Sequence, residues 1–248
     1  MTKRIVPCLD IINNRVVVGE QFKNLQDVED PLSLARYYEQ NEADDLIVYD
    51  ISGKSDSKKQ FLQLIKQISD IVSMPLTVGG GLKTIKDIKQ MLTAGADRVS
   101  INSSAIHNEQ FLKDAINTFG GKHIVLAIDA KEISPGKWHA FTNGGTKDSG
   151  LDIFLWAKRA EKMGVCEIVL NSIDYDGAKS GFAVELNKKM ANSVNIPVIA
   201  SGGAGNVKHF SEVFQKTAVS GALAASILHQ QQVTIRDVKQ HLLEKNIY

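Results

Sequence analysis

Short runs of apolar residues alternate along the chain with longer amphipathic stretches. Most of the short runs are rich in valine and isoleucine and alternate little with polar residues, which is typical of parallel strands buried on both faces. There are eight such runs, at residues 4–9, 46–50, 75–78, 98–101, 123–129, 167–171, 197–200 and 221–225. Between them, stretches such as 61–71 and 152–163 have apolar residues three and four positions apart, which predicts helices. Eight strands that each precede a helical segment predict an α/β fold of the (β/α)8, or TIM, barrel type.

The rival architecture is a doubly wound open sheet, and two observations favour the barrel. An open sheet seldom needs eight strands, and its first strand-to-helix turn should carry a glycine cluster, which is absent here. An internal repeat is the second observation: Asp10 and Asp129 lie 119 positions apart, and the motifs that begin at Pro75 and Pro197 lie 122 apart. Because these offsets are close to half of the 248 residues, we interpret the chain as two duplicated half-barrels. No linker separates the halves, so residues 1–248 are expected to form a single domain.

Polar residues at the ends of the predicted strands are the candidates for chemistry, because barrel active sites lie at the C-terminal ends of the strands. Asp10 ends the first strand and Asp129 ends the fifth. In an eight-stranded barrel these strands are diametrically opposite, so the two carboxylates should face each other across the mouth. Such a pair suits a general acid and a general base that act on opposite faces of one substrate. The alternative is that each aspartate only caps the next segment or pairs with a neighbour such as Lys131; the symmetry of the pair favours the catalytic interpretation.

Two glycine-rich turns predict sites for phosphate groups. Residues 79–81 follow the third strand and residues 201–203 follow the seventh, and glycine there lets backbone N–H groups approach an anion closely. Ser103 and Ser226 follow the fourth and eighth strands, where a hydroxyl and a helix N-terminus would complete each site. Turn geometry alone would explain one glycine-rich turn, but here two copies recur at matching half-barrel offsets. We therefore expect one elongated ligand with a phosphate at each end.

Composition excludes several other classes of protein. The 29 basic and 28 acidic residues give a net charge of +1, so no overall field attracts nucleic acid. No apolar run approaches the roughly 18–20 residues that a membrane span needs, and the first residues lack the apolar core of a signal peptide, so we expect a cytoplasmic protein without a membrane partner. Two cysteines are too few for a disulfide framework, and the six histidines lack metal-ligand spacing, so neither a metal nor another cofactor is expected.

Seven motifs spread over the whole chain resemble those of one enzyme family. They are PCLD at 7–10, LTVGGG at 76–81, GADRVSINSSA at 95–105, AIDAK at 127–131, SIDYDG at 172–177, ASGGAG at 200–205 and ALAAS at 222–226. Together they resemble the cyclase subunits of imidazole glycerol phosphate synthase. The resemblance implies a barrel of histidine biosynthesis that takes ammonia from a separate glutaminase subunit, in a one-to-one heterodimer. Its substrate would be a doubly phosphorylated formimino-aminoimidazole carboxamide nucleotide, and its products imidazole glycerol phosphate and the aminoimidazole carboxamide ribotide that feeds purine synthesis.

The same resemblance implies roles for particular residues. The family's two essential aspartates fall on Asp10 and Asp129. Its phosphate contacts fall on Gly81, Asn102 and Ser103 at one end of the ligand, and on Gly177, Gly203, Ala225 and Ser226 at the other. Asp176, in the loop after the sixth strand, is expected to contact the substrate, although capping of that loop would explain it equally well.

Another set of charged residues is implied to act at the opposite, N-terminal face. The family admits ammonia there through a ring of four alternating charges, and the matching residues are Arg4, Asp45, Arg98 and Glu167. Two of these differ in length from the residues that the family uses most often, but the alternation of sign is kept. Asp97 matches a position at the family's glutaminase interface. Barrels also close their floors with ion pairs, so the spacing alone does not distinguish a gate from a structural plug.

Two segments after strands bear on activity. Residues 131–146 predict a hairpin after the fifth strand that covers the site. After the first strand, the family usually has a loop with the motif GRVVKG, and its lysine is matched here by Val18 in NRVVVG. Either a nearby cation such as Arg15 or Lys23 replaces that lysine, or the chain is a weakened or redirected paralogue. The intact aspartates and glycine-rich turns favour a working cyclase.

Three other functions stay open at this point. The isomerase of the preceding pathway step would share the fold, the duplication and a bisphosphate ligand. A paralogue would use ammonia to amidate a surface sugar, and a non-catalytic barrel would only scaffold or regulate the glutaminase. The motifs AIDAK and SIDYDG match the cyclase better than the isomerase, and the retention of both aspartates argues against the scaffold.

Overall fold

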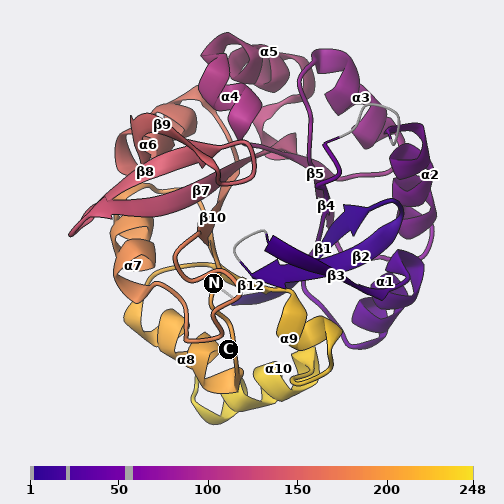
Figure 1. The fold of residues 1–248 in the computed structure, drawn as a ribbon, viewed down its shortest axis with the longest axis vertical. Coiled ribbons are helices and arrows are strands. Elements are labelled where there is room, and N and C mark those ends of the chain that lie inside the picture. The colour runs from indigo at the N-terminus through magenta and orange to yellow at the C-terminus, as the bar shows by residue number, and fades with distance from the viewer. Residues whose placement is uncertain (1–2, 21–22, 54–57, 248) are drawn as a thin grey trace.

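A closed ring of parallel strands forms the centre of the computed structural model, which describes residues 3–20, 23–53 and 58–247 (Figure 1). Within these residues the ring contains eight strands, and β12 pairs with β1 to close it. In order around the ring they are β1 (Arg4–Ile12), β4 (Leu46–Asp50), β5 (Leu76–Gly79), β6 (Arg98–Ile101), β7 (Ile124–Ser134), β10 (Glu167–Ser172), β11 (Val198–Ser201) and β12 (Gly221–Ala224). The predicted (β/α)8 barrel is therefore confirmed.

Helices cover the outer face of the barrel (Figure 1). The longer helices are α1 (Pro31–Gln40), α2 (Lys58–Ser69), α3 (Ile85–Thr93), α5 (Glu109–Phe119), α6 (Ile153–Met163), α7 (Val184–Ser193), α8 (Val207–Lys216) and α10 (Ile235–Glu244). Each turns an apolar stripe towards the strands, and side chains such as Trp156 and Phe210 are fully buried there. None of the described helices is long and apolar enough to span a bilayer. Two short helices, α4 (Ser103–His107) and α9 (Ser226–His229), follow β6 and β12, and a 3-10 turn, η1 (Gly121–His123), precedes β7.

The duplication is visible in two antiparallel hairpins on opposite sides of the ring (Figure 1). They are β2 (Arg15–Glu20) with β3 (Lys23–Glu29), and β8 (Lys137–Thr142) with β9 (Lys147–Asp152). The first follows β1 and the second follows β7. Asp30 and Asp152, which lie 122 positions apart, then cap α1 and α6 in the same way, because each carboxylate accepts a hydrogen bond from a backbone N–H of the first helical turn.

The hairpin predicted over residues 131–146 is present, but the loop predicted over residues 14–19 is wrong. Residues 15–17 pair antiparallel with the end of β1 and continue as strand β2. The reason is the run of three valines, whose branched side chains favour extended backbone and pack on a partner strand. Val18 therefore lies on a strand whose position is fixed by pairing.

The inside of the barrel is packed by its own apolar cluster. It consists of Val6, Cys8, Ile47, Val125, Val169, Ile199 and Leu223. Cys8 is buried in this cluster, so packing accounts for it. The interior is filled and is not an open pore. Polar side chains are left for the two ends of the barrel, the floor at the N-terminal ends of the strands and the mouth at their C-terminal ends.

Candidate active site

The mouth of the barrel holds Asp10 and Asp129 on strands that face each other. β1 and β7 are separated by three strands on either side of the ring, so they lie diametrically opposite. Asp10 is in register with Tyr49 of β4, and Asp129 with Asn171 of β10. The negative charge of Asp129 is one of the influences that raise the pKa of Asp10, so the two carboxyl groups interact across the mouth.

Asp10 is in an environment that favours its protonated form. Burial raises its pKa to about 7, and the charges of Asp176 and Asp129 act in the same direction. The Cys8 thiol donates a long contact of 3.8 Å to Asp10 Oδ1 and opposes this rise. A carboxyl group with a pKa near neutral is able to give up a proton during catalysis.

Asp129 is half-buried, as Asp10 is, but it receives hydrogen bonds from two amide donors. Asn102 Nδ2 donates to Oδ2 over 2.9 Å, and Asn171 Nδ2 donates to Oδ1 over 3.2 Å. Burial raises the pKa of Asp129 to about 6, and the two amide hydrogen bonds act against that rise. Asp129 therefore ionises at a lower pH than Asp10 does.

Asp176 is a third carboxyl group at the mouth. It lies in the loop after β10, where burial raises its pKa to about 6 and the charge of Asp129 contributes. Its neighbour Asp174 turns away and accepts a hydrogen bond of 2.9 Å from the backbone N–H of Glu132, which fixes the loop on β7. The loop is thus held by Asp174, while Asp176 lines the pocket beside Asp10. Within the described parts of the chain, no three histidine, cysteine or carboxylate side chains are arranged to hold a metal ion.

A pocket at the mouth gathers most of the predicted residues of the second half-barrel. The predicted residues that line it are Asp10, Asp176, Gly177, Gly203, Ala225 and Ser226. Gly81, Asn102 and Ser103 do not line this pocket and lie at the ends of β5 and β6, which are opposite β11 and β12 in the ring. The two candidate phosphate sites are therefore on opposite sides of the mouth.

The two candidate phosphate sites have the same backbone geometry. The residue before α4, Asn102, has φ −126° and ψ −93°, and the residue before α9, Ala225, has φ −121° and ψ −83°. Neither side chain caps its helix, so the first N–H groups of each helix are left for another acceptor. A Cβ on Gly80 would lie 2.1 Å from the carbonyl oxygen of Asp50, so the turn after β5 has no room for a side chain.

The serine of the first site is oriented by the second hairpin. The backbone N–H of Asn143, at the tip between β8 and β9, donates to Ser103 Oγ over 3.1 Å. Because this bond occupies a lone pair of the hydroxyl oxygen, the hydroxyl proton is left to donate elsewhere.

Val18 of β2 lines the same pocket as Asp10. Arg15, one candidate replacement for the missing lysine, forms a forked ion pair with Asp27 of β3, with Nε–Oδ2 and Nη2–Oδ1 distances of 2.8 Å each. The side chain of Lys23, the other candidate, lies outside the described part of the chain. Among the described residues that line the pocket there is no lysine, arginine or histidine.

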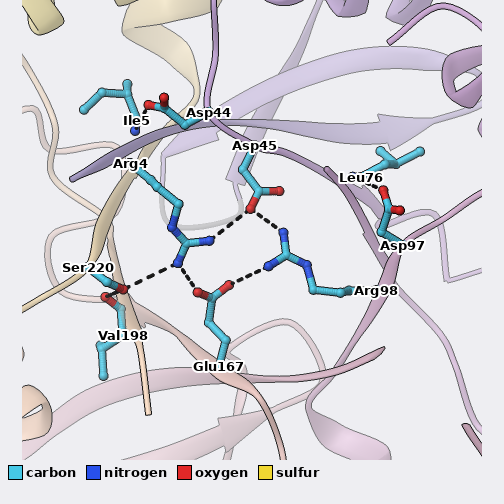
Figure 2. A network of polar contacts seen from close by, with 10 residues as sticks. All are labelled: Arg4, Ile5, Asp44, Asp45, Leu76, Asp97, Arg98, Glu167, Val198 and Ser220. Carbon is cyan, nitrogen blue, oxygen red and sulfur yellow. Dashed lines mark hydrogen bonds and ion pairs between the residues drawn. The ribbon is translucent and has the colours of Figure 1, made fainter. Parts of the chain in front are cut away.

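A closed ring of ion pairs forms the floor of the barrel (Figure 2). Arg4 Nη1 lies 3.1 Å from Asp45 Oδ2, and Arg98 Nη1 lies 3.4 Å from Glu167 Oε2. Arg4 also pairs with Glu167, and Arg98 with Asp45, so each guanidinium bridges both carboxylates. Burial raises the pKa of Asp45 to about 6, and the two arginines counteract this. The predicted alternation of charge is thus a continuous ring in space.

Asp97 lies beside this floor and is exposed, but its carboxylate has a structural partner. The backbone N–H of Leu76, at the start of β5, donates to Asp97 Oδ2 over 2.8 Å (Figure 2). One carboxylate oxygen of Asp97 thus fixes β5, and the charge of the group faces the N-terminal surface.

Asn171 is the residue of the site that the sequence analysis does not single out. Besides its bond to Asp129, its Oδ1 accepts a hydrogen bond of 3.2 Å from Ser201 Oγ. The signal was available, because Asn171 is a polar residue at the end of an otherwise apolar strand. Its partner follows only from the pairing of β10 with β7.

A barrel made of two similar halves, with opposed carboxyl groups at the mouth and a charged floor, defines a (β/α)8-barrel enzyme. Residues 4–234 match the sequence profile of the family described as Histidine biosynthesis protein. The chain is 46% identical over 247 residues to the imidazole glycerol phosphate synthase subunit HisF of Oceanobacillus iheyensis, which covers 100% of this chain and 97% of that protein. It is 45% identical to the subunit of the same name from Streptococcus mutans, covering 100% of this chain and 98% of that protein. The chain therefore belongs to the histidine biosynthesis family.

Proposed function

We propose that this chain is the cyclase subunit of imidazole glycerol phosphate synthase. It uses ammonia to convert the formimino-aminoimidazole carboxamide bisphosphate nucleotide to imidazole glycerol phosphate and aminoimidazole carboxamide ribotide. The observation that carries the proposal is the pair of opposed carboxyl groups, Asp10 and Asp129, in a duplicated barrel whose relatives bear this enzyme's name over their full length.

The different surroundings of the two aspartates indicate which is the general base and which is the general acid. Asp129, with two amide donors and a pKa of about 6, is ionised at neutral pH and is suited to be the general base. Asp10, with a pKa of about 7 and the apolar Val17 as its pairing partner on β2, retains a proton more readily and is suited to be the general acid. The base would take a proton from the nitrogen that ammonia contributes, and the acid would protonate the aminoimidazole amine as it leaves.

The substrate would lie across the mouth with one phosphate at each side. Gly177, Gly203, Ala225 and Ser226 would hold one phosphate, and Gly81, Asn102 and Ser103 the other. Two observations support this: the sites are opposite each other in the ring, and their helix N-termini share one backbone conformation without a side-chain cap. Asp176 would contact the part of the substrate between them, because it lines the pocket beside Asp10.

Ammonia would enter through the floor from a glutaminase partner docked at the N-terminal face. Arg4, Asp45, Arg98 and Glu167 would then act as a gate, because their closed ring blocks the axis of the barrel until its ion pairs part. Asp97 would contact the partner, and a one-to-one heterodimer is the expected assembly. The cytoplasmic location stays a prediction.

Removal of the charge of Asp97 should affect the activity with glutamine and the activity with ammonium differently. Asp97→Asn keeps an oxygen for the Leu76 N–H but loses the charge that a partner would meet. We expect glutamine-dependent activity of the complex to fall by about tenfold, the effect of about 1.4 kcal/mol, while ammonium-dependent activity stays unchanged. Asp97→Ala should spare the ammonium reaction too. Equal losses with both nitrogen sources would mean that Asp97 serves only the barrel.

A cation at position 18 should improve the enzyme. Val18→Lys should raise kcat/KM for the formimino nucleotide by about tenfold if one charge-assisted contact of roughly 1.4 kcal/mol is gained. Val18→Met, which adds length without charge, is the matched control and should have little effect. Because Arg15 is held by Asp27, Arg15→Ala should also have little effect. A large loss in Arg15→Ala, with no gain in Val18→Lys, would instead identify Arg15 as the replacement cation.

One assay distinguishes this function from its rivals. The purified chain is incubated with the formimino nucleotide, with and without ammonium, and the products are separated. A cyclase consumes the substrate only with ammonium, whereas the isomerase reaction needs no ammonia. Absence of any ammonium-dependent turnover would support a redirected paralogue or a scaffold and would refute the proposal.

A further inference from the structure

The two aspartates occupy equivalent places in the two half-barrels but have different neighbours along the ring. Asp10 is in register with Tyr49, and Asp129 is in register with Asn171, at the same strand position in each half. The hydroxyl of Tyr49 contacts Ser100 Oγ over 3.0 Å, whereas the amide of Asn171 donates to Asp129. The two half-barrels thus differ in the side chain that lies beside each aspartate.

The neighbours on the other side differ in the same sense. Asn102 follows β6 and donates to Asp129, and the equivalent residue after β12 is Ala225, which has no side-chain donor. The backbones of Asn102 and Ala225 agree within 10° in φ and ψ, so the difference is one of side-chain chemistry alone. Asp129 therefore receives two amide donors whose counterparts at Asp10 are missing.

The amide of Asn171 is held in one orientation. Ser201 Oγ donates to Asn171 Oδ1 over 3.2 Å, while Asn171 Nδ2 donates to Asp129 Oδ1 over 3.2 Å. The reversed amide would place its oxygen against a carboxylate oxygen of Asp129 and would lose that bond, so the ionised carboxylate fixes the orientation of the amide. The next residue, Gly202, leaves room for this arrangement, because a Cβ there would lie 3.1 Å from Asn171 Oδ1.

We propose that Asn171 is a positioning residue that keeps Asp129 ionised and aimed across the mouth, and that Ser201 holds Asn171 in place for this task. The proposal rests on the proposed function, in which Asp129 is the general base. Asn171 acts through Asp129, because a hydrogen bond to a carboxylate favours its charged form.

Asp129 interacts with three other titratable groups at the mouth. The titratable groups whose charges interact with Asp129 are Asp176 from the loop after β10, Asp10 from β1 and Tyr49 from β4. All three are acidic, and the negative charge of Asp129 raises the pKa of each of them. Lys131, the next titratable residue along β7, lies over the ring of Phe141. The amides of Asn102 and Asn171 are the groups that oppose the effect of burial on Asp129.

The test measures the titration of Asp129 directly. Aspartate carboxyl carbons are labelled with ¹³C in the full chain without substrate, and the Asp129 signal is assigned by its loss in Asp129→Asn. Asn171→Leu, which has the same branched shape and lacks the donor, should raise the pKa of Asp129 by about one unit. The acidic limb of the kcat/KM profile should move up by the same amount. At pH 6 the loss should be about fivefold, it should approach tenfold at lower pH, and it should largely disappear above the shifted pKa.

Two further variants keep the test decisive. Tyr49→Phe changes the equivalent position of the other half and should leave the titration of Asp129 unchanged. If Asn171→Leu does not fold, Asn171→Ser serves instead, because its hydroxyl is too short to reach Asp129 and the same rise is expected. An unchanged pKa of Asp129 in either folded Asn171 variant, or a loss of activity that is equal at every pH, would overturn the proposal. The titration needs no turnover, so it decides the role of Asn171 even if the proposed function fails.

Discussion

Asp10→Asn and Asp129→Asn should each lower kcat for ammonium-dependent cyclisation by at least about 10²-fold, the usual scale for loss of a general acid or base. Asparagine has nearly the size of aspartate but does not exchange a proton at neutral pH, so the substitution removes proton transfer and leaves the shape of the mouth intact. The measurement is steady-state turnover of the formimino nucleotide at saturating ammonium.

The stability of these variants provides the control. The pKa of Asp10 is raised from 3.8 to about 7 in the folded protein, so its contribution to stability is full below about pH 4 and is lost as the pH rises through 7. Asp10→Asn has no charge to bury, and its Tm at pH 8 should equal or exceed that of the unmodified protein. Near-normal turnover in either asparagine variant would show that the catalytic assignment of that aspartate is wrong.

Ser226→Asp should raise KM by about 10²-fold and lower kcat much less. The substitution places a negative charge where one phosphate is expected, and two such charges about 4 Å apart repel by a few kcal/mol at the effective dielectric of a protein surface. Because this repulsion acts on the bound substrate and the transition state alike, it affects binding and not the chemical step.

Ser103→Asp should have the same effect at the other side of the mouth. Ser226→Ala and Ser103→Ala, which remove a hydroxyl without adding charge, are the matched controls and should raise KM by about tenfold or less. The variants are compared by KM and kcat for the formimino nucleotide at constant ionic strength. An unchanged KM in both aspartate variants would refute an elongated ligand with two phosphates.

The sequence was sufficient to predict the barrel, because its strands are buried on both faces and are therefore continuous apolar runs. Strand β2 was not predicted from the sequence. Its valines pair with the end of β1, and such pairing depends on contacts across a turn that hydrophobic periodicity does not report. The eight strands of the ring were predicted to within five residues at each end, and helices α2 and α6 to within three, whereas β3 and β9 were not predicted.

The residues of the candidate site were predictable where a general rule of the fold relates sequence position to position in the barrel. Because the C-terminal ends of barrel strands meet at the mouth, the sequence alone predicts that Asp10 and Asp129 lie there together. The same rule does not give the neighbours of each aspartate. That Asn171 donates to Asp129, while Tyr49 does not donate to Asp10, follows from strand register and side-chain direction in three dimensions.

The difference in pKa between the two aspartates was likewise beyond the sequence. It arises from burial, from the position of Asp176 in its loop, and from amide donors on neighbouring strands. The sequence also assigned Asp97 only to an interface, whereas its carboxylate additionally fixes the start of β5.

Transfer of ammonia nitrogen into the product is the sharpest test of whether this chain is an ammonia-dependent cyclase. The purified chain is given the formimino nucleotide and ¹⁵N-ammonium without glutamine, and both products are examined by mass spectrometry. We expect one ¹⁵N atom in the imidazole ring of imidazole glycerol phosphate, and an equal amount of unlabelled aminoimidazole carboxamide ribotide. Conversion of the substrate without ¹⁵N in any product, or no conversion at all, would contradict the proposed function.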